Sequence, residues 1–447
     1  MNEMSLIELA KNIRSGRTSS EVYVAACNER IERYDQDIQA WAWYDPRQAL
    51  DAARLADKHA RNAASRLPLG GVPIAIKDII DTAGMPTEIG SPIFRGRVPD
   101  RDAFVVERLK QLGAVIMGKT VTTEFAWSNP GKTHNPWNTN HTPGGSSSGS
   151  AAAVAAGFVP AALGTQTMGS VVRPAAFCGV VGFKPSYGLI SRRGIHPFAN
   201  TLDHVGAFAH SVKDVGFLAH LLMGYDANDA SCLASGGFVP GKFSIPNLER
   251  PPRLALVRTP AWFLADDAQK NCLYASADTL RHSGAMVDEL TLPIAFDGAL
   301  QAAQTIMRCE ATLVFSPLRT AHPNKVSKAI DDVVATGQAF SAFEYLNALH
   351  LRAELRAQLL DVMQGFDAII TPPAPGEAPE GLAATGNPAF CAIWSLLGVP
   401  AINIPVALGA KGLPLGLQIV GGYRDDQKML SVARWCETRL LFSQRPV

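Results

Sequence analysis

Two short apolar runs separated by a helical segment constrain the fold of this chain more than any other feature. The first run, residues 71–76, contains β-branched residues and ends at Lys77 and Asp78. A helical pattern covers 102–112, and the second apolar run follows at 114–119. Strand, helix and strand in this order predict a parallel βαβ unit. The sequence is therefore predicted to fold in the α/β class, with helices covering a central sheet.

The rest of the chain extends this α/β pattern. Residues 1–65 are predicted to be a helical segment, and 66–447 a single large α/β domain with a mixed central sheet covered by helices. A helical insertion is expected around 240–365, whereas 163–174 is predicted to be a loop because its side chains are small. Further strands are predicted at 254–257, 368–373, 400–405 and 415–420.

Composition excludes several classes of function. With 41 basic and 40 acidic residues the formal net charge is +1, which leaves no basic excess for binding nucleic acid. The seven cysteines are scattered and form no Cys-x-x-Cys pair, so neither a zinc site nor a disulfide framework is expected. Residues 1–10 lack the apolar run of a secretory signal, and no apolar stretch is long enough to span a bilayer. We expect a cytoplasmic protein without membrane or nucleic-acid partners.

A lysine stands directly after the first predicted strand. Burial disfavours the charged ammonium form of Lys77, and a neutral lysine is a competent general base. The alternative is a lysine that reaches solvent beside Asp78. The segment by itself leaves both interpretations open.

The segment 144–150, Gly-Gly-Ser-Ser-Ser-Gly-Ser, is a second candidate for chemistry. Its glycines permit a close backbone approach to a ligand, and its serines offer hydroxyl groups. A flexible linker or a phosphate-binding loop has a similar composition. However, the segment runs straight into a small-residue helix at 151–156, and the lysine of a phosphate-binding loop is missing.

The third candidate is 164–174, which places Ser170 and Arg173 three positions apart among small residues. A serine nucleophile needs backbone amides nearby to stabilise the developing oxyanion. The alternative is an ordinary capped turn.

Together, these three segments resemble the amidase signature family. The family pattern is the Gly/Ser-rich loop, a short Ala-rich helix and a Gly-Thr-x-x-x-Gly-Ser loop, with a Lys-Asp strand end upstream. Ser146 follows Lys77 by 69 residues and Ser170 follows Ser146 by 24. The likeness extends over most of the chain, including the motifs at 398–405 and 414–418.

The resemblance implies the amidase signature fold and hydrolysis of small-molecule amide C–N bonds without a metal or cofactor. Ser170 would attack the carbonyl carbon and form an acyl-enzyme, while Ser146 passes protons between Ser170 and the base Lys77. The peptide bond between Gly145 and Ser146 is expected to be cis. The oxyanion hole would consist of the backbone amides of Thr167, Met168, Gly169 and Ser170.

Two positions depart from the common family pattern. Many members have glycine where this chain has Met168, whose side chain either lines the acyl pocket or points away. Many members carry arginine at the position of Val172, whereas malonamidase-like members carry it at that of Arg173. Within the family this chain most resembles the malonamidase-like members, in which that arginine holds a substrate carboxylate. The alternative for Arg173 is a structural role in its loop.

Several functions within this framework stay open. The leading interpretation is hydrolysis of small amides, with a carboxylate on the acyl side of the substrate as one option. An aryl amide, ester or carbamate hydrolase would instead use an apolar pocket formed by Met168 and residues such as Trp127, Phe198 or Trp394. The A-type component of a partner-dependent, tRNA-linked amidotransferase uses the same fold and passes ammonia to another protein. An inactive binding protein is disfavoured because all three triad residues are present. The oligomeric state is open, with a homodimer as one option.

Other reactive residues are weaker candidates. Cys178 has no histidine beside it in the sequence and is predicted to be a small core residue. His196, His204 and His210 lack the spacing of metal ligands, so we expect them to be structural.

Overall fold

The computed structural model describes residues 4–60, 67–232 and 243–446. Within these ranges eleven strands form one sheet in the order β1-β3-β2-β4-β6-β5-β10-β11-β9-β7-β8. The strands are β1 (Trp41–Tyr44), β2 (Pro73–Lys77), β3 (Val115–Thr120), β4 (Ala161–Gln166), β5 (Val181–Lys184), β6 (His204–Ala209), β7 (Arg253–Val257), β8 (Met286–Leu290), β9 (Ala368–Thr371), β10 (Ala401–Leu408) and β11 (Pro414–Val420).

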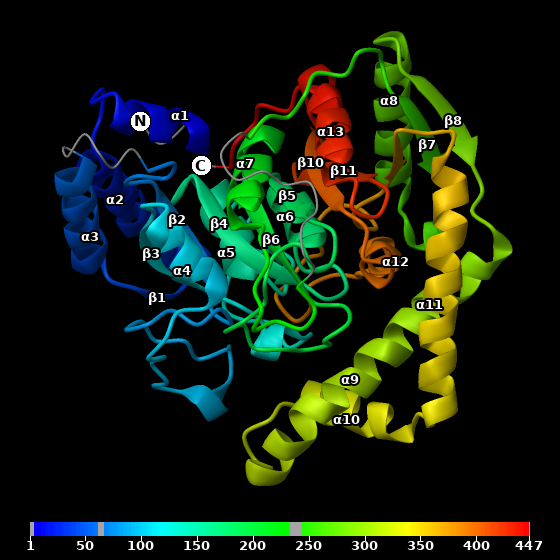
Figure 1. Cartoon of the computed structure of the whole chain (residues 1–447), viewed down its shortest axis with the longest axis horizontal. Coiled ribbons are helices and arrows are strands. Elements are labelled where there is room, and N and C mark those ends of the chain that lie inside the picture. Colours follow the sequence, from blue (N-terminus) through cyan, green and yellow to red (C-terminus); the bar gives the residue numbers. More distant parts are fainter. Residues whose placement is uncertain (1–3, 61–66, 233–242, 447) are drawn as a thin grey trace.

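Helices cover the sheet, and three of them extend away from it (Figure 1). Those three, α9, α10 and α11, follow one another between β8 and β9. The described helices are α1 (Leu6–Arg14), α2 (Ser20–Ile38), α3 (Pro46–Ala60), α4 (Phe104–Gln111), α5 (Ser148–Ala155), α6 (Val172–Cys178), α7 (Val212–Leu222), α8 (Asp267–His282), α9 (Ala299–Ala321), α10 (Lys328–Ala339), α11 (Ala342–Met363), α12 (Ala389–Leu397) and α13 (Asp426–Leu440).

The sheet is mixed, as predicted. Strand β2 pairs in parallel with β3 and β4, which confirms the βαβ unit expected from the sequence. Strands β4 and β5 both pair antiparallel with β6, and β10 pairs antiparallel with β5 and β11. The α/β class and the single mixed sheet covered by helices are therefore confirmed.

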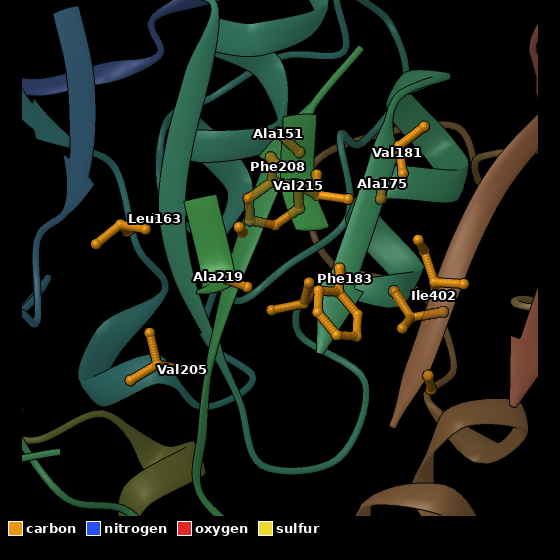
Figure 2. Close-up of a cluster of buried hydrophobic side chains, with 14 of the residues drawn as sticks. Ala151, Leu163, Ala175, Val181, Phe183, Val205, Phe208, Val215, Ala219 and Ile402 are labelled. Carbon is orange, nitrogen blue, oxygen red and sulfur yellow. The ribbon is translucent and has the colours of Figure 1, made fainter. Parts of the chain in front are cut away.

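Small residues let α5 pack very closely on the sheet. A Cβ atom at Gly149 would lie 2.2 Å from the Ala40 carbonyl oxygen and 2.4 Å from the Val121 amide nitrogen. The centre of the core is filled by larger side chains. Figure 2 shows Phe208 and Phe183 projecting from neighbouring strands among apolar residues of β4, β5, β10 and the helices. This dense packing fixes the backbone that carries the candidate site.

The segment 163–174, predicted to be a loop, is only partly a loop. Residues up to Gln166 belong to β4, and α6 begins at Val172. Strand β4 has the sequence Ala-Ala-Leu-Gly-Thr-Gln, in which Thr165 is the single β-branched residue. Its position between β2 and β6, buried along its whole length, overrides this weak local preference.

The ends of the predicted segments are only partly described. The boundary at residues 65–66 and the first residues of the insertion, 240–242, lie outside the described residues. Within 1–65 the structure also contains a strand, β1, which pairs with β3 at the edge of the sheet. None of the helices that the structure describes has the length and apolar character needed to span a membrane.

Candidate active site

The fold brings Lys77 and the Gly/Ser-rich loop into direct contact. Lys77 is the last residue of β2, and Ile76 before it pairs with Leu163 of the parallel strand β4. The Lys77 Nζ atom donates hydrogen bonds to Ser146 Oγ at 2.7 Å and to Thr165 Oγ1 at 2.8 Å. Parallel strands therefore place the amine of one strand end beside hydroxyl groups from the next strand and from the loop.

Burial increases inward from Ser170 to Lys77. The Ser170 residue is 8% exposed, Ser146 is 1% exposed and Lys77 is fully buried. Burial lowers the pKa of the Lys77 amine well below its ordinary value, although the nearby Asp203 carboxylate opposes this effect. A neutral amine 2.7 Å from a hydroxyl oxygen can accept its proton. The arrangement can thus support general base chemistry on the Ser146 hydroxyl.

The Gly/Ser-rich loop is held against β4. The Gly145–Ser146 peptide bond is cis, as the resemblance implied. The Ser147 hydroxyl donates to the Thr165 carbonyl oxygen at 3.1 Å and accepts from the Thr165 amide at 3.3 Å. The Thr123 amide donates to the Ser146 carbonyl oxygen at 3.2 Å. These contacts fix the backbone on both sides of the Ser146 side chain.

Gly164 leaves the space that this loop occupies. A Cβ atom added there would lie 2.6 Å from the Phe208 ring and 2.7 Å from Ser147 Oγ. We therefore expect Gly164→Ala to displace the loop, to lower kcat and to destabilise the fold by about 1–3 kcal/mol. Steady-state kinetics and urea unfolding measure the two effects. Gly224→Ala is the matched control, because a Cβ atom at Gly224 meets open space. Equal behaviour of the two variants would contradict the expectation.

The loop after β4 is organised by one glutamine. The Gln166 Oε1 atom accepts from the amides of Val171 at 2.9 Å and Val172 at 3.0 Å, and its Nε2 atom donates to Ser395 Oγ at 2.9 Å. The Ser395 hydroxyl in turn donates to the Met168 carbonyl oxygen at 3.0 Å. Sequence reasoning missed both residues. The glutamine stands inside the quoted motif, but Ser395 lies in α12 and has no local signal.

Three amides of this loop are unused by the protein. Among the described residues, no hydrogen bond is donated by the backbone amides of Met168, Gly169 or Ser170. The Met168 side chain packs among buried hydrophobic residues and is 8% exposed. Consecutive free amides beside a serine hydroxyl can donate hydrogen bonds to a negatively charged oxygen.

Arg173 is buried against the same loops. Its Nη2 atom donates to the Gly145 carbonyl oxygen at 2.7 Å and to Thr385 Oγ1 at 3.1 Å, and its Nη1 atom donates to the Gly386 carbonyl oxygen. Burial lowers the pKa of Arg173 to about 10. No carboxylate of the described residues forms an ion pair with it, and its Nε atom has no hydrogen-bond partner. These contacts anchor the residue that precedes Ser146 and leave the positive charge uncompensated.

A cavity of about 240 Å³ adjoins this site. Thr165 and Thr167 form part of its wall, and residues 192–205 and 228–231 supply most of the rest. Phe198 in this wall stacks on Trp127, with ring centroids 5.0 Å apart. By contrast, Trp394 is fully buried in α12 and does not line the cavity.

Comparison with known proteins identifies the family. The Amidase family model matches residues 23–430. The chain belongs to the amidase signature family. The A-type component of glutamyl-tRNA(Gln) amidotransferase from Anaeromyxobacter sp. (strain K) is 34% identical over 98% of this chain and 96% of that protein. The family assignment makes this protein an enzyme that acts on amide carbon–nitrogen bonds, as a hydrolase or an amidotransferase.

Solved structures have the same fold over nearly the whole length of this chain. One of them superposes with a TM-score of 0.89. It is a chain from a vestigial protein complex that reveals the evolutionary origins of an s-triazine catabolic enzyme. It is 29% identical, covering 97% of this chain and 98% of that one. The peptide amidase of Stenotrophomonas maltophilia gives a TM-score of 0.84 at 28% identity, covering 100% and 98%.

The remaining candidates are buried or half-buried side chains, and two of them, His196 and His204, line the cavity. Burial raises the pKa of the Cys178 thiol, whose Sγ atom donates to the Pro143 carbonyl oxygen at 3.4 Å. Burial lowers the pKa of His196 to about 4 and of His210 to about 3, and that of His204 also falls well below its ordinary value. In the described parts of the chain, no group of three His, Cys, Asp or Glu side chains is placed to hold a metal ion.

Proposed function

We propose that this protein cleaves amide C–N bonds of small molecules through Ser170, Ser146 and Lys77. One observation carries the proposal: the fully buried Lys77 amine hydrogen-bonds Ser146 Oγ at 2.7 Å and has no carboxylate ion-pair partner among the described residues. A buried lysine without a counter-ion is neutral, and its lone pair can take a proton.

The first half-reaction forms an acyl-enzyme. Ser170 Oγ attacks the carbonyl carbon, its proton moves to Ser146 Oγ, and the Ser146 proton moves to Lys77 Nζ. The carbonyl oxygen becomes an oxyanion that accepts hydrogen bonds from the loop amides of 167–170. The Lys77 ammonium then returns the proton through Ser146 to the leaving nitrogen, the C–N bond breaks, and an ester on Ser170 remains.

The second half-reaction restores the enzyme. Water attacks the Ser170 ester, and its proton follows the same path to Lys77 through Ser146. Collapse of the tetrahedral intermediate releases the carboxylic acid, and Ser170 regains its proton. The products are one acid and one amine or ammonia, and the sequence of steps uses only the three side chains and the loop amides.

We propose a malonamidase-like substrate, an amide with a carboxylate on its acyl side. Two features support this class: arginine stands at position 173, and its buried guanidinium has no carboxylate partner among the described residues. A substrate carboxylate would neutralise that charge by a charge-assisted contact. The anchoring of Gly145 is a second role of the same side chain.

Arg173→Ala separates these two roles. We expect it to lower kcat/KM for neutral amides because the anchor on Gly145 is lost. For anionic amides we expect a further loss of about ten- to a hundredfold, since a charge-assisted hydrogen bond is removed as well. Kinetics on a matched pair of neutral and anionic substrates measures the difference. Thr385→Val is the control, because it removes one contact of Arg173 and keeps the charge. Equal losses for both substrates would eliminate the anionic class.

The partner-dependent amidotransferase is a second candidate function. Two curated relatives, from Anaeromyxobacter sp. (strain K) and Methylococcus capsulatus, are 34% identical to this chain over nearly its whole length. Both are named as the A-type component of glutamyl-tRNA(Gln) amidotransferase. These names favour the second candidate over a stand-alone hydrolase. The Ser170 acylation step is common to both, and the two differ in where the released ammonia goes.

A hydrolysis screen of the purified chain tests the proposal. The substrates are malonamate-like acids, neutral aliphatic amides, anilides, carbamates and glutamine, and the readout is release of ammonia or amine. Turnover by the chain alone supports a hydrolase. The class of substrate that is cleaved fastest then shows which acyl group the site accepts. Co-purification of a second protein from the native host, with ammonia release only in its presence, supports the amidotransferase. Light scattering on the same sample determines the oligomeric state, for which a homodimer is one option. Absence of turnover under both conditions would contradict the proposal.

A further inference from the structure

A buried network continues from Lys77 to a carboxylate that the sequence did not single out. Strands β4 and β6 are antiparallel, and Gln166 pairs with His204. The next pair beyond the strand ends is therefore Thr167 and Asp203. The Thr167 Oγ1 atom donates to Asp203 Oδ1 at 2.6 Å. The register of the sheet thus places a carboxylate beside Thr167, the first residue of the loop 167–170 that carries Ser170 (the nucleophile loop).

The Asp203 carboxylate also holds the loop that lines the cavity. Its Oδ2 atom accepts from the amides of Phe198 at 2.8 Å and Ala199 at 3.0 Å. Burial raises the pKa of Asp203, while the Arg192 guanidinium and the three hydrogen bonds lower it. All three contacts are donated to the carboxylate, which is the pattern that stabilises its ionised form. One side chain therefore connects the nucleophile loop to the cavity wall.

Asp203 is on the same side of the sheet as the Lys77 amine. Thr165, Thr167 and Asp203 all line the same cavity, so their side chains lie on one side of the sheet. The Thr165 hydroxyl accepts a hydrogen bond from Lys77 Nζ at 2.8 Å, and the Thr167 hydroxyl donates one to Asp203. The negative charge of Asp203 opposes the effect of burial on the pKa of Lys77.

The other charged groups near β2 are on its opposite face. In the parallel pairing of β2 and β3, Lys77 lies beside Thr120 and Lys119 lies beside Ile76, so the two lysines point to opposite faces. Lys119 forms an ion pair with Asp78 at 3.3 Å. Among the described residues, Asp203 is therefore the carboxylate that faces Lys77.

We propose that Asp203 is a positioning residue for the amide-cleaving site: it fixes Thr167 at the start of the loop that carries Ser170 and places a carboxylate on the side of the sheet where the Lys77 amine lies. This inference rests on the proposed function, because both effects act on groups assigned there. The carboxylate forms no hydrogen bond with Ser170 among the described residues. Its loss should lower the rate of acylation more than substrate binding, since the loop amides act most strongly on the oxyanion of the transition state.

Variants of both partners test the positioning role. Asp203→Asn and Thr167→Val are expected to lower kcat about ten- to a hundredfold, with much smaller changes in KM. Thr167→Ser keeps the hydroxyl group and is expected to retain nearly wild-type kcat. The double variant Asp203→Asn/Thr167→Val should be no slower than the worse single variant, because either change alone ends the hydrogen bond from the Thr167 hydroxyl to an ionised carboxylate. If Asp203→Asn does not fold, the comparison of Thr167→Ser with Thr167→Val still tests the proposal. Equal kcat values for these two variants would overturn it.

The pH profile separates positioning from a general loss of stability. Without the negative charge the ammonium form of Lys77 is less favoured, so the acid limb of the kcat/KM profile should move to lower pH in Asp203→Asn. Thr167→Val keeps the carboxylate and should leave the midpoint in place. Asp214→Asn is the matched control, a buried carboxylate on α7 that accepts from the Ile7 amide. It should lower Tm without moving the midpoint.

The outcomes distinguish the two proposals. Loss of all wild-type turnover in Ser170→Ala establishes the reaction on which the Asp203 role depends. An Asp203→Asn enzyme with an unchanged midpoint and unchanged kcat would overturn the role of Asp203 and leave the proposed function intact. Turnover by Ser170→Ala close to that of the wild type would overturn the proposed function itself.

Discussion

Ser170→Ala is expected to abolish amide hydrolysis and covalent labelling while leaving the fold unchanged. Without the Oγ atom no acyl-enzyme forms, and loss of a serine nucleophile from a triad lowers kcat by on the order of 10⁴–10⁶-fold. Residual turnover would come from the loop amides alone. Product release is the first measurement, and the second is mass spectrometry after treatment with a fluorophosphonate. Circular dichroism checks that the fold is intact.

A remote serine provides the control for this variant. Ser276 lies within α8 and donates to the Cys272 carbonyl oxygen of the same helix at 2.7 Å. Ser276→Ala should label and turn over like the wild type. An adduct on Ser146, Ser147 or Cys178 in the wild-type protein would show that the nucleophile has been assigned to the wrong residue.

Lys77→Ala and Lys77→Arg are both expected to reduce turnover nearly as far as Ser170→Ala. Alanine removes the proton acceptor, and the guanidinium of arginine does not lose its proton in proteins and cannot act as a base. Members of a catalytic triad act as a unit, so loss of the base also lowers kcat by orders of magnitude. Substrate binding should change much less, because Lys77 is fully buried behind Ser146. Pre-steady-state kinetics separates binding from acylation.

The pH dependence follows from the same lysine. Burial lowers the pKa of Lys77 far below the ordinary value of 10.5, and only the deprotonated amine accepts the Ser146 proton. Activity should therefore rise with pH through this lowered pKa and reach a plateau well below pH 10.5. Lys119→Met is the matched control, a second buried lysine whose ion pair with Asp78 lies on the other face of β2. It should lower stability without moving the midpoint. Near wild-type turnover by Lys77→Arg would falsify the assignment of the base.

The sequence was most informative where local pattern and chemistry coincide. The βαβ unit could be predicted because 71–76 and 114–119 are apolar and short, whereas the end of the first strand by itself left open whether Lys77 is buried or reaches solvent. The cis bond before Ser146 followed from the family resemblance. Strand β4 was missed because half of its residues are alanine or glycine, which have a weak preference for strands. The missed strand matters, since it carries Thr165 beside Lys77.

Residues that act over long sequence distances could not be found from local pattern. Gln166 bonds Ser395, 229 positions away, and Arg173 bonds Thr385, 212 positions away. Glu310 of α9 accepts from the Thr201 amide and hydroxyl at 2.8 Å, which ties the extended helices to the loop before Asp203. Polar residues of this kind resemble ordinary surface positions in sequence, and only the assembled sheet shows their partners.

The position of β10 and β11 within the sheet has a consequence for synthesis of the chain. Strand β10 pairs with β5, and β11 pairs with β9, so these two late strands join the two halves of the sheet. Before residues 401–420 leave the ribosome, β5 and β9 are both open edges, and unpaired edges are prone to associate with other chains. Lys77, Ser146 and Ser170 are all translated long before this closure. The nascent protein thus carries its reactive groups on an incomplete sheet until nearly the whole chain has emerged.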